Sequence, residues 1–99
     1  MAAQSVWLAR HDGTDIVGAD QVAGVSRDYN GNIIVHLTGA RGSAVTLVAP
    51  GPHGGPHTPD DFHRRLLRVV AGLPHNSEPT LVRPVADEST GWQWITEPL

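Results

Sequence analysis

Three histidines near one loop are the first residues of this chain whose types and spacing suggest a chemical function. His53 and His57 flank a Gly-Gly-Pro stretch, and His63 follows in the next predicted helix. Imidazoles bind divalent metal ions, and Asp60 or Asp61 would complete a His/carboxylate set for Zn²⁺ or Ni²⁺. The spacing matches no established zinc signature, so the other interpretation is a solvated linker with incidental histidines. Metal or small-ligand binding is therefore our alternative function, and no cofactor is expected.

The same loop has the outline of a phosphate site, because a strand, a glycine-rich loop and a helix N-terminus follow one another. The residue types oppose that interpretation. No Gly-Lys-Ser/Thr follows, prolines remove backbone donors, and Asp60 with Asp61 would repel an anion. We reject a phosphate site here.

A short basic face on the predicted helix is a candidate contact for a partner. It consists of Arg64, Arg65 and Arg68. Three arginines beside two first-turn aspartates also make an ordinary solvated helix face. The net charge of −3 argues against nucleic acid, since phosphate neutralisation dominates that kind of binding. All seven cationic residues are Arg, which is typical of high-GC bacterial genomes, such as actinobacterial ones. We expect a protein partner and no nucleic acid.

Two tryptophans near the C-terminus form a second candidate contact. Trp92 and Trp94 would point to the same side of a strand, because side chains alternate along it. Tryptophan is enriched among the residues that anchor protein interfaces. The pair therefore either covers the domain's own core or docks on a partner or a second copy, and both alternatives stay open.

Catalysis finds little support in the sequence. The five serines lie in no nucleophile-elbow context, and the absence of cysteine removes a thiolate nucleophile and a Cys-ligated metal. The carboxylates Asp12, Asp15, Asp20 and Asp28 lie in turn-like contexts. We expect a protein that is not an enzyme.

A helix over residues 58–73 would position the arginines. Thr58 is the expected N-cap, and Pro59 suits the first helical position. At the other end, Gly72 is expected to adopt a left-handed conformation, and Pro74 cannot continue the helix.

One face of this helix is apolar and needs a surface to cover it. On the polar face, Asp60 and Asp61 are expected to pair with Arg64 and Arg65, four residues further on. The apolar stripe consists of Phe62, Leu66, Val69, Val70 and Leu73.

The first half of the chain supplies strands for that surface. Asn30-Gly31 favours a type I′ hairpin, and a break in alternation near Gly24 suggests a bulge. Strands joined by short turns pair in antiparallel fashion. The expected strands are residues 5–10, 15–17, 21–28, 33–37 and 43–49, with weaker candidates at 80–86, limited by Pro84, and 91–96.

Length and composition predict one soluble globular domain. Ninety-nine residues suit a single core, and 39% hydrophobic with 17% charged residues indicates a folded chain. We predict an α+β fold, in which an antiparallel β-meander of four to five strands carries one amphipathic helix on one face. Residues 1–79 form the sheet and helix, and residues 80–99 form a Trp-containing C-terminal tail of the same domain.

The expected function follows from these elements. An open meander has edges that can pair with other strands. We therefore expect a small non-catalytic interaction module that acts through a sheet edge or the C-terminal Trp tail, with a homodimer as one form. No apolar run approaches the roughly 20 residues of a membrane span. No signal peptide opens the chain and it lacks cysteine, so we expect a cytoplasmic protein.

Overall fold

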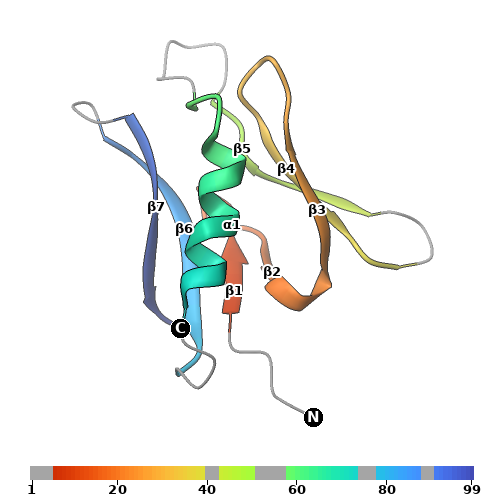
Figure 1. Cartoon of the computed structure of the whole chain (residues 1–99), viewed down its shortest axis with the longest axis vertical. Coiled ribbons are helices and arrows are strands. Elements are labelled where there is room, and N and C mark those ends of the chain that lie inside the picture. Colours follow the sequence, from red (N-terminus) through yellow and green to blue (C-terminus); the bar gives the residue numbers. More distant parts are fainter. Residues whose placement is uncertain (1–5, 40–42, 51–57, 74–77, 88–90) are drawn as a thin grey trace.

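The computed structural model describes residues 6–39, 43–50, 58–73, 78–87 and 91–99 (Figure 1). In these residues it contains one α-helix, one short 3₁₀ helix and seven strands in two sheets. The predicted α+β class is confirmed. No helix in the described ranges has the length and apolar character needed to cross a membrane.

The larger sheet, called sheet A, joins the two ends of the chain. Its first two strands form a hairpin, and β1 then runs parallel to β6, which pairs antiparallel with β7. The two predicted tail strands are therefore part of a sheet and not an appendage. The spatial order is β2 (Ile16–Gly18), β1 (Val6–Ala9), β6 (Thr80–Asp87) and β7 (Gly91–Pro98).

The smaller sheet, called sheet B, is an antiparallel meander of three strands. It consists of β3 (Val22–Arg27), β4 (Ile33–Leu37) and β5 (Ala44–Val48). The meander is shorter than predicted, because the 3₁₀ helix η1 (Ala19–Gln21) separates the first hairpin from β3. The first hairpin then pairs with β6 instead.

Each edge strand of sheet B carries a β-bulge. In β3, Val22 pairs with Leu37 and Gly24 with His36, so Ala23 is the extra residue. The predicted bulge near Gly24 is thereby confirmed. In β5 the extra residue is Leu47, since the pairing passes from Ile33–Val48 to Ile34–Thr46.

The β3–β4 turn differs from the predicted type I′ hairpin. Gly31 has a φ of +85°, but Asn30 does not have a positive φ, which a type I′ turn requires. Gly31 N donates to the carbonyl of Asp28, and Asp28 N donates to the carbonyl of Asn32. The Asp28 carboxylate also accepts from the backbone N–H groups of Asn30 and Asn32. These bonds favour a right-handed turn followed by one left-handed glycine.

Helix α1 (Phe62–Gly72) begins later than predicted, and the N-cap prediction for Thr58 is wrong. Thr58 is 2% exposed, and its hydroxyl donates to the carbonyl of Gly31 at 2.7 Å. Pro59 precedes the helix in a turn that its carbonyl closes with Phe62 N. The buried threonine thus holds the β3–β4 turn. Asp61 occupies the N-cap position, but its side chain makes no capping hydrogen bond to the helix backbone.

The end of the helix also differs from the prediction. Gly72 is still helical and does not have a positive φ, and the C-cap is Leu73 in an extended conformation with φ of −77°. Leu73 N donates to the carbonyl of Val70, which closes the last turn. A left-handed glycine is therefore not needed here.

The core forms where α1 lies over both sheets (Figure 1). The helix contacts β7 of sheet A and β3 of sheet B. The predicted apolar stripe is confirmed, with Phe62 and Leu66 buried and the other three residues packed against the core. The buried core residues are Leu8, Ile33, Val35, Leu47, Val48, Phe62, Leu66, Val82 and Trp92.

Candidate functional site

The two C-terminal tryptophans pack against the start of α1. The ring of Trp94 stacks on Phe62 with centroids 4.6 Å apart and planes 14° apart, and Trp94 Nε1 donates to the carbonyl of Phe62 at 2.8 Å. Trp92 is 8% exposed and meets Phe62 at a centroid distance of 6.5 Å. Both indoles therefore lie on the inner face of β7, as strand alternation predicted. Direct contact of either indole with a partner stays a prediction.

His11 completes this aromatic cluster and connects the two sheets. Its ring meets Trp92 edge-on at 6.1 Å. Its backbone N–H donates to the carbonyl of Leu47 at 2.9 Å, and Nδ1 lies 3.2 Å from the same oxygen. Leu47 is the bulged residue of β5, so the bulge carbonyl is available for this link. The sequence indicates no more than a turn residue at His11, because its partners are more than 30 residues away.

Strand β7 lies at an edge of sheet A and is regular along its whole length. Its pairing with β6 runs without a shift from Thr80–Pro98 to Asp87–Gly91. No described element lies beyond β7, which is drawn in dark blue at the outer left of Figure 1. One side of an eight-residue strand is thus open in the described part of the chain.

Pro84 shows which peptide groups of β7 point outward. In an antiparallel pair, hydrogen-bonded residue pairs alternate with non-hydrogen-bonded pairs. Pro84 has no N–H and lies opposite Trp94, so this is a non-hydrogen-bonded pair. Counting along the strands from Pro84–Trp94, the alternation makes Pro79–Leu99 a hydrogen-bonded position. Leu99 N does donate to the carbonyl of Pro79. The peptide groups of Trp94 and Thr96 therefore point away from β6, toward the open edge.

Pro84 was expected to limit the penultimate strand, and β6 nevertheless continues to Asp87. The same alternation explains this. The missing N–H of Pro84 would face the β1 side, and the pairing of β1 with β6 covers only the positions from Thr80 to Val82. Pro84 therefore removes no ladder hydrogen bond to β7.

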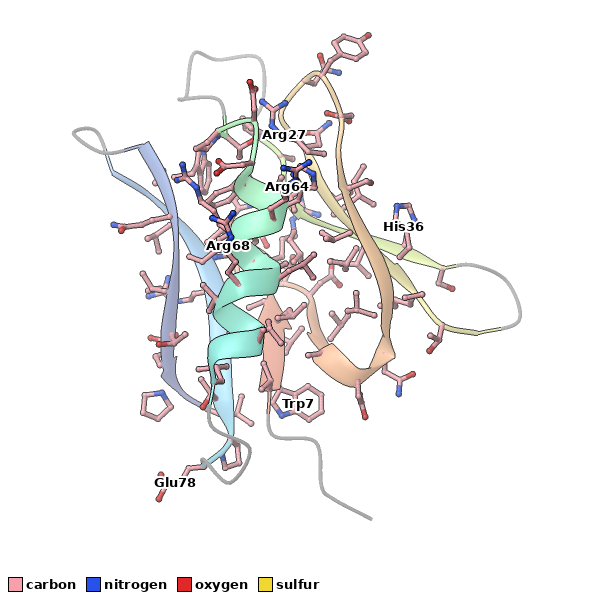
Figure 2. The ribbon with its side chains drawn as sticks, viewed as in Figure 1. Trp7, Arg27, His36, Arg64, Arg68 and Glu78 are labelled. Atoms are coloured by element: carbon pink, nitrogen blue, oxygen red, sulfur yellow. The ribbon has the colours of Figure 1, made fainter. Side chains whose placement is uncertain are left out.

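The face of sheet A that lies opposite to α1 is partly apolar. Trp7 shares this face with Leu81, its register partner on β6, and Trp7 is labelled at the lower end of β1 in Figure 2. An ion pair crosses the same face, with Arg83 Nε 2.8 Å from Glu97 Oε1. Five apolar residues of this outer face do not pack against the core: Trp7, Ile16, Leu81, Val85 and Ile95.

The three predicted basic residues of α1 have different surroundings. Arg64 and Arg68 are exposed on the helix, as Figure 2 shows. Arg65 pairs with Asp61 at 3.0 Å, as predicted, and this hydrogen bond holds the pKa of the Asp61 carboxyl below its usual value. The predicted pair of Asp60 with Arg64 is wrong.

Asp60 instead lies 3.7 Å from Arg27 Nη1. Arg27 is half-buried beside the start of α1, where Nη2 donates to the carbonyl of Thr58 at 2.8 Å and Nε donates to its hydroxyl at 3.1 Å. The guanidinium therefore carries the polar link between sheet B and the helix. Sequence reasoning missed this role, because 31 residues separate the two partners.

Of the three histidines predicted to bind a metal, the structure describes one. His53 and His57 lie outside the described residues. His63 lies in the first turn of α1, and its buried Nδ1 has no hydrogen-bond partner in the described structure. The described residues contain no group of three or more potential metal ligands. Metal binding through His53, His57 and His63 stays a prediction.

A serine and a histidine that the sequence does not connect lie together on sheet B. Ser26 Oγ is 3.1 Å from His36 Nε2, across β3 and β4, and the pair is exposed. A nucleophilic dyad needs a third group that orients the base. Within the described residues, no carboxylate contacts His36, so this pair is an ordinary cross-strand hydrogen bond.

Sheet A offers the clearest features for contact with another molecule. The outward peptide groups of Trp94 and Thr96 can hydrogen-bond a further strand, and the outer face beside them is partly apolar. The open edge belongs to β7, and the apolar face extends over all four strands of sheet A. Comparisons with protein-family models, with curated proteins and with solved structures found no match to this chain.

Proposed function

We propose that this protein is a non-catalytic interaction module that binds an extended segment of a protein partner along the open edge of β7. The observation that carries this proposal is the outward direction of the peptide groups of Trp94 and Thr96. Extended peptides add to exposed sheet edges through such main-chain groups. A cytoplasmic location and an origin in a high-GC bacterium stay predictions from composition.

The edge of β7 lacks protections that natural sheets use against strand pairing. Short strands, bulges, prolines and exposed charges usually block an edge. In the described structure, β2 has three residues, and β3 and β5 are bulged. On β7, the charge of Glu97 is paired with Arg83, and Pro98 stands at the very end. From Gly91 to Thr96, β7 is regular and carries no charged side chain.

The tryptophans support this edge from behind. The Trp94 ring is held by its stack on Phe62 and by the bond from Nε1 to the Phe62 carbonyl. Because both contacts hold β7 against α1, the edge is ordered before a partner arrives. Preorganisation of this kind lowers the entropy cost of binding.

An NMR titration with a neutral peptide of alternating Thr and Val tests the proposal. We expect the amide signals of Trp94 and Thr96 to shift and to exchange more slowly with solvent, while those of Ile95 and Glu97 change little. Thr96→Pro should abolish this binding without losing a ladder bond, since Thr96 N–H points outward and edge strands tolerate proline. Thr96→Val, which keeps the N–H, is the matched control. Shifts on β5 instead of β7, or no shifts at all in a monomeric sample, would contradict the proposal.

Binding of a metal or small ligand is the second candidate, and the buried, unbonded Nδ1 of His63 favours it. A thermal melt with added Zn²⁺ or Ni²⁺ tests this candidate. An increase in Tm that His63→Ala abolishes would support it. An unchanged Tm at every metal concentration would rule out this candidate.

A further inference from the structure

We infer that the strand bound by β7 is β7 of a second copy of this chain, paired antiparallel about a two-fold axis at Ile95. This inference depends on the proposed open edge and names its occupant. The two copies would form one continuous sheet that contains both copies of sheet A. Closed two-fold dimers are the commonest soluble assemblies.

The outward peptide groups of β7 are complementary to themselves in this arrangement. Trp94 and Thr96 lie on either side of Ile95, so the axis places Trp94 opposite Thr96 of the second copy, and the reverse. Each of these residues directs an N–H and a C=O outward. Both pairs therefore become hydrogen-bonded pairs of an antiparallel ladder.

The side chains between these pairs also match. Ile95 lies opposite its own copy, where non-hydrogen-bonded pairs bring side chains closest together. Gln93 lies opposite Glu97, so its amide can donate to a carboxylate. No like charges face each other. A register shifted by two residues would instead place Ile95 opposite Glu97 or Gln93, which sets an apolar side chain against a polar one.

The outer face of sheet A becomes continuous across such a dimer. Ile95 is half-buried and does not pack against the core, and Arg83 of β6 lies next to it in register. Pairing at the axis would cover the two Ile95 side chains. The opposite edge of sheet A is the three-residue strand β2, so the assembly would stop at two copies.

Charge pairs at position 95 provide the test. Sedimentation equilibrium of the full chain should show a dimer for the parent. Ile95→Lys and Ile95→Glu should each be monomeric, because like charges would meet at the axis. A mixture of the two variants should form a heterodimer. Leu81→Lys, on the same face but one strand further in, is the control and should remain dimeric, with circular dichroism confirming that every variant is folded.

Each other outcome overturns a stated part of the inference. A parent that stays monomeric at the highest soluble concentration excludes the second copy, whereas the Thr/Val peptide titration still decides whether the edge binds a strand. Dimerisation of Ile95→Lys as strong as that of the parent excludes the axis at Ile95. If Leu81→Lys were monomeric, and if the mixture of Ile95→Lys with Ile95→Glu formed no heterodimer, the copies would associate through sheet faces and not through edges.

Discussion

Sheet A and sheet B hold the same end of α1, and they do so through different chemistry. Sheet A uses aromatic packing, in which Trp94 stacks on Phe62 and donates to its carbonyl. Sheet B uses a polar link, in which Arg27 binds the hydroxyl and carbonyl of the buried Thr58. The helix start is therefore held by apolar contact on one side and by directed hydrogen bonds on the other.

The two sheets also end in different kinds of edge. Sheet B has a bulge at Ala23 in β3 and at Leu47 in β5, and the carbonyl of Leu47 accepts from His11. Sheet A ends in β7, whose register with β6 has no interruption. In the described structure, the bulged strands of sheet B therefore make links within the molecule, whereas the regular strand β7 has an open edge.

The largest expected effect breaks the apolar side of this comparison. Phe62→Ala removes the ring that both Trp92 and Trp94 contact, and we expect a loss of about 3–5 kcal/mol in the free energy of unfolding. Chemical denaturation followed by tryptophan fluorescence measures this loss. Leu67→Ala, on the same helix but 54% exposed, should change stability by about 0.5 kcal/mol or less. Equal losses in the two variants would contradict the central position of Phe62.

A smaller effect is expected on the polar side. Thr58→Val keeps the side-chain volume but leaves the Gly31 carbonyl and Arg27 Nε without their partner. Unsatisfied buried groups cost about 1–3 kcal/mol, so we expect a loss in that range. The control is Thr46→Val on β5, and denaturant melts of both variants provide the measurement. If Thr58→Val were no less stable than this control, the polar link would not hold sheet B to the helix.

The smallest expected effect concerns pH and the β3–β4 turn of sheet B. The Asn32 side-chain amide, and then the backbone N–H groups of Asn32 and Asn30, hold the pKa of Asp28 below its ordinary value of 3.8. The ionised form is thus favoured in the folded state. The stabilisation that these hydrogen bonds give to the folded state is present above pH 3.8. It is lost as the pH falls through the lowered folded-state pKa of Asp28.

Asp28→Asn should therefore make stability less dependent on pH in the acid range, and Asn32→Ala should act in the same direction. Thermal melts between neutral and acid pH measure both variants. If either variant lost stability toward acid pH more steeply than the parent, the stabilising role of the Asp28 carboxylate would be contradicted. The matching hydrogen bonds of Asp12 with Thr14 lower the pKa of Asp12 in the β1–β2 turn of sheet A, so the comparison extends to both sheets.

Features with a local cause could be predicted from the sequence. The stripe that includes Phe62 and Leu66 follows from helical spacing, and β4 (Ile33–Leu37) follows from strict alternation of apolar residues. The bulge near Gly24 was visible as a break in that alternation. The i,i+4 pair of Asp61 with Arg65 needed no more than the geometry of one helix.

Features that depend on distant residues were decided by the tertiary structure. The parallel pairing of β1 with β6 joins residues more than 70 positions apart, and it moved the first hairpin out of the predicted meander. Thr58 has the sequence context of an N-cap, but burial beside Gly31 and Arg27 gave its hydroxyl other partners. Pro84 was tolerated because its missing N–H faces away from β7.

Local sequence patterns determined where helix and strands form, because backbone propensity and periodicity act over a few residues. Which strands pair, which edge stays open and which polar groups bond were set by packing across the chain, where burial leaves each group the partners that lie within reach.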